Sequence, residues 1–342
     1  MMKRHVNIPI FIPHLGCPNQ CVFCNQRTIS GVSEFNISDV KSQIETALAT
    51  VDSSSEAEIA FFGGSFTGID RELMESLLRL AYEYVSSGRV KSLRCSTRPD
   101  YINEEILSLL KQYGVTTIEL GLQSSSDHVL SLTRRGHSYD DEAKACKMIV
   151  EQGFSLVGQM MIGLPGSTIE SEIATAQFII DSGADGARIY PTVVFHDTEL
   201  CNMASAGEYS PLDLDDAVER SVRVLEMFLD AGIDVIRIGL CSSENLTDTD
   251  KYYAGPNHPA LGEMVESAMI YNKISRLLNK NISYSDVTLR VTVAKGYLSK
   301  ATGQKKSNKN RLIREFGFAD VKITEDIALR GYQFKIEEER KR

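Results

Sequence analysis

The chain has 342 residues, of which 42% are hydrophobic and 24% charged, and its formal net charge is −9. This length suits one large α/β domain with a smaller second domain. No apolar run approaches the roughly 20 residues that cross a bilayer, and the apolar part of the start MMKRHVNIPIFIPHLG is too short for a signal peptide. Seven cysteines that cluster only once predict a reducing, cytoplasmic compartment and no disulfides.

Charge is spread unevenly along the chain. Residues 273–342 contain 17 Lys and Arg against 8 Asp and Glu, a net charge of +9, so the preceding residues carry −18. A basic tail on an acidic body indicates binding to a polyanion, and a solvated basic helix face is the plain alternative. We place the domain boundary accordingly, with residues 1–272 in the first domain and 273–342 in the second.

Short apolar runs alternate with amphipathic stretches through the first domain. Strands are predicted at Asn7–Pro13, Ala57–Phe62, Lys91–Thr97, Thr116–Gln123, Ser155–Ile162, Gly186–Val194 and Val235–Leu240. Helices are predicted at Asp39–Thr50, Arg71–Val85, Asn103–Tyr113, Asp140–Gln152, Ser167–Asp181 and Pro211–Asp230. This alternation predicts a parallel sheet of βαβ units. A partial (β/α)6-type barrel is favoured over a doubly wound sheet because the informative residues follow successive strands, whose ends meet at one barrel mouth.

Three cysteines follow the first predicted strand. Cys17, Cys21 and Cys24 lie in HLGCPNQCVFCNQR with the spacing C-x3-C-x2-C. A [4Fe–4S] cluster normally takes four thiolates, so three on one loop would leave one iron open to a small molecule. Zinc usually takes four ligands in paired knuckles, and no second C-x2-C occurs. The remaining cysteines have no ligand spacing and are expected to be small buried side chains: Cys95, Cys146, Cys201 and Cys241.

The cysteine loop resembles that of radical S-adenosylmethionine (SAM) enzymes. The resemblance implies a [4Fe–4S] cluster that reductively cleaves SAM to a 5′-deoxyadenosyl radical, with an electron donor such as flavodoxin or ferredoxin. It also implies that Gly63 and Gly64, with Ser65 beside them in FFGGSFTG, offer backbone groups to the methionine amino group. Two glycines allow this close approach because they have no side chain.

Further residues at predicted strand ends have the chemistry for binding SAM. The Gln123 amide can bind a ribose hydroxyl or a carboxylate, and Arg135 can form a two-pronged contact with a carboxylate. Ile162 and its neighbours can form an apolar face for adenine. The plain alternative for Gln123 is a hydrogen-bonded amide at a sheet end, and for Arg135 it is a helix cap on the surface. For Ile162 and its neighbours it is an ordinary strand–turn–helix connection.

A narrower resemblance covers roughly residues 8–270. Five segments occur in the order found in the radical SAM domain of the Elongator catalytic subunit family, which modifies wobble uridines of tRNA. They are STRPD (Ser96–Asp100), ELGLQS (Glu119–Ser124), RRGH (Arg134–His137), MIGLPGS (Met161–Ser167) and IYPTVV (Ile189–Val194). The likeness implies SAM contacts from Gln123, Arg135 and Gln159. The oxygen-independent coproporphyrinogen oxidases share the general plan.

Two departures from this family are visible. Many relatives carry a ribose-binding Glu where this chain has Ser96, so that contact is expected to be weaker or relocated. The roughly 70 residues after the barrel-like region leave no room for the family's acetyltransferase domain. The carboxymethylation chemistry therefore does not simply carry over.

The basic tail resembles a degenerate KH module. We predict a strand (Val287–Val293), a helix (Gly296–Ala301), a tight loop (Gly303–Lys306), a helix (Ser307–Phe316) and a strand (Asp320–Thr324). In KH modules the GxxG loop clamps a single-stranded RNA backbone. Here Lys306 replaces the second glycine. The lysine side chain hinders close approach of an RNA backbone to the loop, but its charge can bind a phosphate. The residues expected to bind RNA are Gly303, Lys305, Lys306, Lys309 and Arg311, and a small αβ cap that closes the barrel is the alternative.

Taken together, these features predict a radical SAM enzyme that acts on RNA, in particular tRNA. One rival is a radical SAM enzyme acting on a small metabolite or tetrapyrrole, and another is a non-catalytic iron–sulfur RNA-binding protein. In the segment YYAGPNHPALGEMVES, His258 is a further active-site candidate, followed by Glu263 and Glu266 at a helix start.

Overall fold

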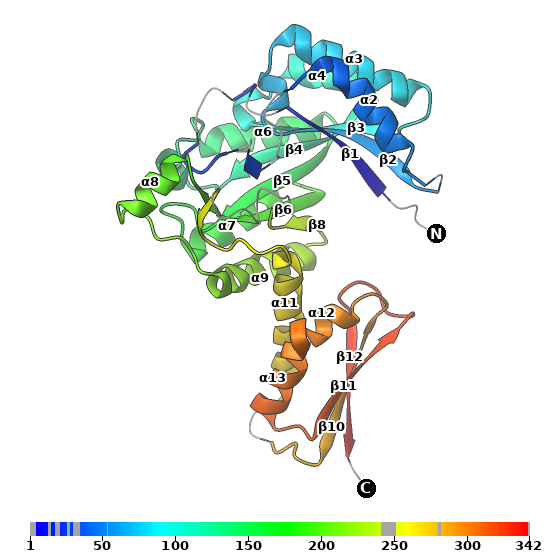
Figure 1. Ribbon diagram of the computed structural model, residues 1–342, viewed down its shortest axis with the longest axis vertical. Coiled ribbons are helices and arrows are strands. Elements are labelled where there is room, and N and C mark those ends of the chain that lie inside the picture. Colours follow the sequence, from blue (N-terminus) through cyan, green and yellow to red (C-terminus); the bar gives the residue numbers. More distant parts are fainter. Residues whose placement is uncertain are drawn as a thin grey trace. The chain divides into compact units, whose positions relative to one another are not determined.

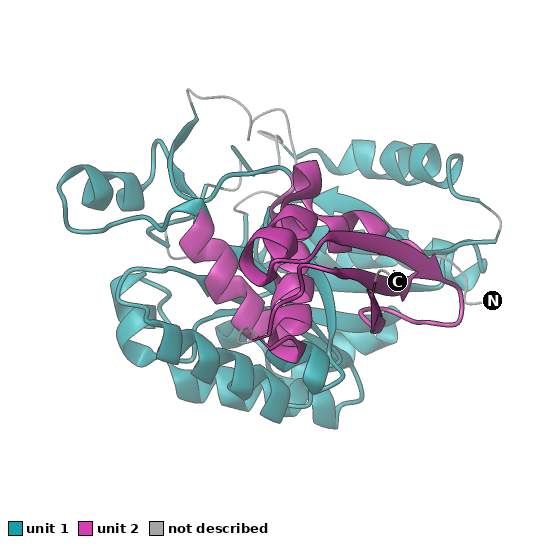
Figure 2. Cartoon of the chain, turned by 90° about the horizontal axis from the view of Figure 1, so that it is seen from below, with its two compact units in different colours: residues 1–214, 227–259 teal, residues 215–226, 260–342 magenta. Residues whose placement is uncertain are grey.

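The computed structural model describes residues 5–12, 15–17, 21–25, 28–29, 35–52, 54–240, 251–279 and 282–340. It divides into two compact units (Figure 2). Unit 1 comprises residues 1–214 and 227–259, and unit 2 comprises residues 215–226 and 260–342. The predicted boundary between residues 272 and 273 falls inside helix α11 (Leu261–Leu277), all of which belongs to unit 2.

Unit 1 is built on a seven-stranded parallel sheet, curled as a partial barrel, with strand order β1-β2-β3-β4-β5-β6-β8 (Figure 1). The predicted barrel-like alternation of strands and helices is therefore confirmed. The strands are β1 (His5–Phe11), β2 (Glu56–Phe62), β3 (Ser92–Thr97), β4 (Val115–Gln123), β5 (Ser155–Ile162), β6 (Gly186–Pro191) and β8 (Asp234–Ile238).

Helices connect successive strands, as parallel pairing requires. Local sequence sets their starts: Asn36, Asp70 and Asn103 accept backbone hydrogen bonds at N-caps, and Ser138 and Thr168 form capping boxes. The helices are α2 (Ile37–Leu48), α3 (Arg71–Ser86), α4 (Glu104–Gln112), α5 (Asp127–Leu132), α6 (Tyr139–Glu151), α7 (Ile169–Asp181), α8 (Glu199–Ser205) and α9 (Leu214–Asp230). Residues 215–226 of α9 belong to unit 2. Figure 1 shows α2, α3 and α4 together on one side of the sheet.

The predicted strand Gly186–Val194 is shorter in the structure. The chain leaves the sheet after Pro191, and β7 (Val194–Phe195) pairs antiparallel with β9 (Tyr252–Ala254). The apolar run continues past the strand end because Val194 packs in a separate cluster with Val22 and Leu200. That cluster ties the cysteine loop to α8.

Unit 2 carries a three-stranded sheet of order β11-β10-β12. Its elements are β10 (Val287–Ala294), α12 (Leu298–Thr302), a short 3-10 helix (Gln304–Lys306), α13 (Ser307–Phe316), β11 (Asp320–Asp326) and β12 (Phe334–Arg340). The predicted order strand–helix–turn–helix–strand is confirmed, with β10 and β11 parallel. The sequence analysis did not predict β12, whose residues are mostly charged and exposed.

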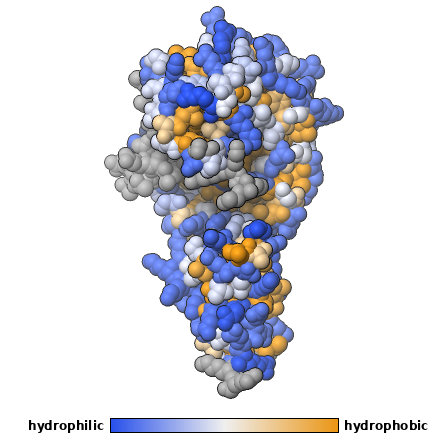
Figure 3. Space-filling view, turned by 90° about the vertical axis from the view of Figure 1, so that its right-hand side faces the viewer, coloured by the Kyte–Doolittle hydropathy of each residue, from blue (hydrophilic) through white to orange (hydrophobic). Residues whose placement is uncertain are grey.

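Within the described ranges, no helix is long and apolar enough to cross a membrane. On the face drawn in Figure 3, hydrophobic residues form separate patches among hydrophilic ones. The six described cysteines are all free thiols.

Candidate active site

A cavity of about 1060 Å³ opens in unit 1 beside the carboxyl ends of the strands. Its wall is formed by the cysteine loop, the turn after β2, residues from β3, β4 and β5, the segment after α5 and the start of α8. The lining residues used below are Cys17, Cys21, Cys24, Gly63, Gly64, Ser65, Ser96, Arg98, Gly121, Gln123, Arg134, Arg135, Gln159, Asp197, Thr198, Glu199 and Asn202.

All three predicted cluster ligands line this cavity. Cys21 is the most buried, and its Sγ accepts a hydrogen bond of 3.3 Å from Arg135 Nη1. The Cys17 Sγ lies 3.7 Å from Ser65 Oγ. Among the described residues no three His, Cys, Asp or Glu side chains are gathered as for a metal ion, and residues 18–20 of the loop lie outside the description. Three thiols of one loop that face one cavity are nevertheless the donor set that a cluster with an open iron takes.

Two glycines bring backbone close to the cavity. Gly63 has a φ of +97°, and a Cβ there would meet the Ile12 backbone at 3.0 Å. At Gly121 a Cβ would lie 3.1 Å from Gln123 Nε2 and 3.5 Å from Arg135 Nη2. Gly121 therefore provides the space in which the Gln123 amide and the Arg135 guanidinium meet.

Gln123 has an unsatisfied polar atom at the cavity wall. It follows a register shift in β4 and has a φ of 73°, which is uncommon outside glycine. Its Oε1 is buried and has no hydrogen-bond partner within the described part of the chain. Because a buried acceptor without a partner is costly, this oxygen fits a ligand that donates a hydrogen bond.

Gln159 is fixed in one orientation by its neighbours. Its Nε2 donates to Glu119 Oε2 at 3.0 Å and to Ser96 Oγ at 3.3 Å. Since an ionised carboxylate only accepts hydrogen bonds, the amide presents nitrogen to Glu119 and keeps its oxygen for other partners. Ser96, the departure from the family pattern, thus supports Gln159 in the wall of the cavity.

Beneath the cavity, strands β2 to β6 carry a buried network of two carboxylates and two guanidiniums. Glu119, which is 0% exposed, accepts from Arg94 Nη1 at 2.9 Å and forms two contacts with Arg188, of 2.8 and 2.7 Å. Glu58 pairs with Arg94 at 2.5 Å. Burial opposes the charge of Arg188, but nearby Tyr190 and Glu119 raise its pKa above the ordinary value. Because the charges balance, the network can stay ionised inside the sheet.

A second, largely buried group of polar side chains, Arg98, Asp100, His137 and Glu142, lies beside Cys21. The Arg98 guanidinium lies 4.0 Å from Cys21 Sγ and forms a two-pronged ion pair with Asp100, at 2.9 and 3.0 Å. Burial alone would raise the pKa of Asp100, but contact with His137 and the Arg98 hydrogen bonds hold it well below its ordinary range. His137 Nδ1 lies 3.7 Å from Asp100 Oδ1, which is longer than a hydrogen bond.

Glu142 is the last member of this polar group. His137 Nε2 lies 3.0 Å from Glu142 Oε1, and both side chains are fully buried. Burial raises the pKa of Glu142 to about 7, although His137 opposes the shift. The sequence analysis assigned no role to Arg98, Asp100 or His137, although they belong to STRPD and RRGH. What joins them is tertiary packing between two loops, which spacing along the chain does not reveal.

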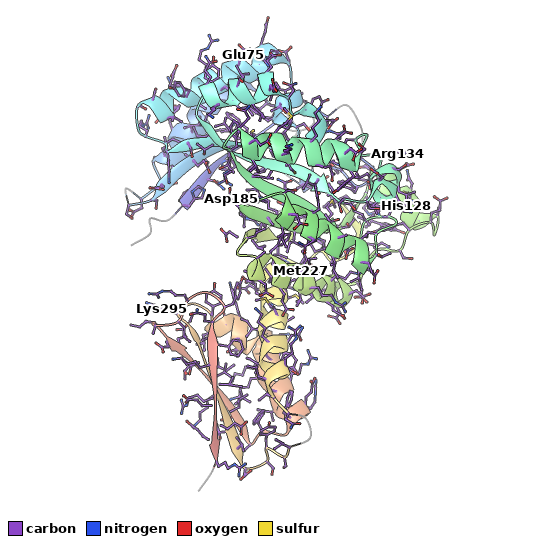
Figure 4. All side chains as sticks on the ribbon, turned by 180° about the vertical axis from the view of Figure 1, so that it is seen from behind. Glu75, His128, Arg134, Asp185, Met227 and Lys295 are labelled. Atoms are coloured by element: carbon purple, nitrogen blue, oxygen red, sulfur yellow. The ribbon has the colours of Figure 1, made fainter. Side chains whose placement is uncertain are left out.

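At the rim of the cavity, Arg134 Nη2 pairs with Glu199 Oε1 at 2.9 Å. Arg134 has a φ of 53° and a largely exposed side chain, and Figure 4 shows it on the same side of unit 1 as His128. The sequence analysis also missed Asp197, in the connection after β7, and Glu199 and Asn202 of α8, because tertiary packing brings this segment to the cavity.

Some predicted residues lie away from the cavity. Ile162 is 0% exposed and does not line it, because side chains alternate along β5 and Ile162 faces opposite to Gln159. His258 does not line it either. In unit 2, Glu266 is paired with Lys300 at 2.8 Å, and Glu263 lies in the first turn of α11.

The scattered cysteines behave as expected where they are described. Burial raises the pKa of the Cys95 thiol strongly and that of Cys146 to about 12, so both are inert buried side chains. Cys201 is half-buried and packs against the cluster of Val22 and Val194. Cys241 lies outside the described residues.

The residues predicted to bind RNA lie in unit 2 and differ in their surroundings. Lys305 and Lys306 are exposed, have φ values of 51° and 62°, and form no ion pair within the described residues. Lys309 pairs with Asp320 at 2.9 Å. Arg311 pairs with Glu315 at 2.7 Å and stacks 4.0 Å from the Tyr271 ring. Gly303, with a φ of +76°, could not hold a Cβ, which would lie 2.3 Å from Ser307 Oγ.

Comparison with known families agrees with this site. The model of the Radical SAM superfamily matches residues 11–179, and that of the Radical_SAM C-terminal domain matches residues 184–271. The chain belongs to the radical SAM superfamily. The cysteine loop and strands β2 to β6 and β8 fall within the matched ranges, whereas β1 precedes them except for Phe11.

Among curated relatives, the tRNA uridine(34) acetyltransferase of Methanocaldococcus infernus is 30% identical over 186 residues, 48% of this chain and 35% of that protein. Elongator complex protein 3 of Homo sapiens is 28% identical over 195 residues, 51% of this chain and 36% of that protein. The match thus spans about a third of each relative. The solved structure of the archaeal Methanocaldococcus infernus Elp3 with an N-terminal deletion has a TM-score of 0.64 at 22% identity, covering 82% of this chain and 65% of that one. The predicted likeness to the Elongator catalytic subunit family is confirmed.

Proposed function

We propose that this chain holds a [4Fe–4S] cluster through Cys17, Cys21 and Cys24, binds SAM in the cavity beside it, and modifies RNA, in particular tRNA. The observation that supports this proposal is the meeting of the cysteine loop, the glycine turn and two glutamines, Gln123 of β4 and Gln159 of β5, in one cavity. These segments are up to about 140 residues apart in sequence. A cytoplasmic location and a flavodoxin or ferredoxin as electron donor belong to the same proposal.

Different residues of the cavity wall bind different parts of SAM. When bound, the cluster supplies the electron that cleaves the carbon–sulfur bond of SAM. The Gly63–Gly64 turn offers backbone groups at a point where no side chain intrudes. The Oε1 atoms of Gln123 and Gln159 serve as acceptors for the amino or hydroxyl groups of the ligand.

Arg135 supplies the positive charge for the carboxylate of SAM. Its guanidinium already donates to Cys21 Sγ and to the Gly121 carbonyl, so it stands between the cysteine loop and β4. Ser96 acts through Gln159, which its hydroxyl holds, in place of a direct two-pronged ribose contact. The cavity wall thereby fixes the orientation of the ligand.

An RNA substrate is supported by two observations. The relatives with matching radical SAM regions are named as tRNA uridine(34) acetyltransferases. Unit 2 presents Lys305 and Lys306 as exposed cations on a tight turn, where a phosphate can reach them. Lys309 and Arg311 already pair with carboxylates, so we expect them to contribute less.

RNA binding is tested with the double variant Lys305→Glu/Lys306→Glu. Each lost phosphate contact should lower the slope of log affinity against log salt by about 1, so the double variant should lower it by about 2. Lys335→Glu is the matched control, because Lys335 is an exposed lysine on β12 of the same unit. Equal effects of the two variants would contradict a specific role for the turn.

Substrate class is tested by mass spectrometry of nucleosides from total RNA of cells with and without this protein. The proposal predicts at least one modified nucleoside that disappears with the gene and returns with the wild-type protein but not with Cys21→Ala. An unchanged nucleoside profile would favour a small metabolite or tetrapyrrole as substrate. Return of the nucleoside with Cys21→Ala would favour a non-catalytic RNA-binding role.

A further inference from the structure

The segments STRPD and RRGH, in which Arg98, Asp100 and His137 have no assigned role, meet at the cysteine loop. Arg98 of the first segment donates through Nη2 to the backbone carbonyl of Arg135 in the second. The same guanidinium directs Nη1 at Cys21 Sγ, 4.0 Å away. Arg98 therefore contacts both the proposed cluster ligand and the proposed SAM-binding segment.

Asp100 and the Arg135 carbonyl hold this guanidinium in place. Its Nε and Nη2 pair with the two oxygens of Asp100, and the Arg98 side chain is only 4% exposed. Asp100 in turn lies 3.7 Å from His137 Nδ1, and the other ring nitrogen of His137 lies 3.0 Å from Glu142 Oε1. A planar guanidinium that forms two parallel hydrogen bonds to a carboxylate has little freedom to move away from the sulfur.

A cation fixed beside a cluster ligand has a defined electrostatic effect. Reduction adds one negative charge to a cluster, and hydrogen bonds or positive charge at the ligand sulfur stabilise the reduced form. In a buried site this interaction is screened less than in water. The pairing of Arg98 with Asp100 offsets part of its charge but leaves Nη1 directed at Cys21.

We propose that Arg98 is a positioning residue that raises the reduction potential of the cluster, by holding a fixed positive charge against the Cys21 sulfur. This inference rests on the proposed function, because it requires that Cys21 ligates the cluster. Asp100, with His137 and Glu142 behind it, keeps the guanidinium in place. The role is separate from the binding of SAM by Arg135.

The test is a redox titration of the anaerobically reconstituted full chain, followed by the electron paramagnetic resonance signal of the reduced cluster in the absence of SAM. The cluster of Arg98→Gln should have a more negative potential than that of the wild type. Arg98→Lys keeps the positive charge but loses the two-pronged contact with Asp100, so the potential of its cluster should lie between those of the wild type and Arg98→Gln. If Arg98→Gln does not fold, Arg98→Lys decides, because its potential should still be more negative than that of the wild type.

Arg134→Gln is the matched control. Arg134 also lines the cavity, but it is largely exposed and pairs with Glu199, so its loss should leave the potential within error of the wild type. An Arg98→Gln cluster with the wild-type potential, or an equal shift in Arg134→Gln, would overturn the inference. A wild-type chain that binds no four-iron cluster would contradict the proposed function itself, so the two failures are distinguishable.

Discussion

Substitution of Glu119 is the sharpest test of how the sheet supports the cavity. The Glu119 carboxylate is fully buried and accepts hydrogen bonds from Arg94, Arg188 and Gln159. Glu119→Gln keeps the shape but leaves two buried guanidiniums with Glu58 as their remaining carboxylate in this network. Removing one member of a buried ion pair costs about 3 to 5 kcal/mol, because the partner's charge stays buried without compensation.

The expected loss is large compared with that at a surface ion pair. Glu75, labelled in Figure 4, pairs with Arg71 one helical turn away, and Glu75→Gln is the matched control. Exposed pairs of this spacing contribute about 0.3 to 0.5 kcal/mol. Glu119→Gln also removes the carboxylate that orients Gln159, so we expect weaker SAM binding in this variant and none of that effect in the control.

The assay is urea unfolding monitored by hydrogen–deuterium exchange in β4 and β6, the strands that carry Glu119 and Arg188. Exchange in these strands reports unit 1 without a contribution from unit 2. A free-energy change for Glu119→Gln no larger than that for Glu75→Gln would refute the reasoning. It would mean that the buried network contributes no net free energy to the stability of unit 1.

Three further predictions concern the cavity wall, the pH dependence of stability and the basic turn. Gly121→Ala should weaken SAM binding at least tenfold by calorimetry, because the new methyl group would lie 3.1 Å from Gln123 Nε2; unchanged affinity would contradict the assignment of this wall. Burial raises the pKa of Glu142 to about 7 from an ordinary 4.5, so its protonation stabilises the fold below pH 4.5 and this contribution is lost as pH rises through 7. Thermal melts of Glu142→Gln should lack that decline, and a parallel decline in both proteins would contradict it. Lys305→Glu/Lys306→Glu should leave the circular dichroism spectrum unchanged while RNA affinity falls at low salt, and a lost fold would show that the turn is structural instead.

Periodicity was sufficient to predict most of unit 1. The strand Ser155–Ile162 and the helix start at Arg71 agree with the structure residue for residue, because buried parallel strands and capped helices leave strong local signals. The strand after Gly186 was predicted too long, since the apolar residues beyond Pro191 pack in a cluster of their own. Apolar character alone does not say which core a residue joins.

For the site, motif spacing was more informative than side-chain chemistry. The cysteines and Gly63, which follow strand ends, line one cavity together with Gln123, the last residue of β4. Ile162 does not, since its role depended on which face of β5 it occupies. The contact of Arg98 with Cys21 depends on packing between two loops, and no pattern along the chain encodes it.

The most direct measurement of the central claim is the formation of 5′-deoxyadenosine. The reconstituted protein, reduced anaerobically and given SAM, should yield this nucleoside together with methionine. Cys21→Ala, prepared in the same way, should bind no four-iron cluster and yield neither product above background. A wild-type protein that carries its cluster and binds SAM, yet forms no 5′-deoxyadenosine on reduction, would contradict the claim that this chain is a radical SAM enzyme.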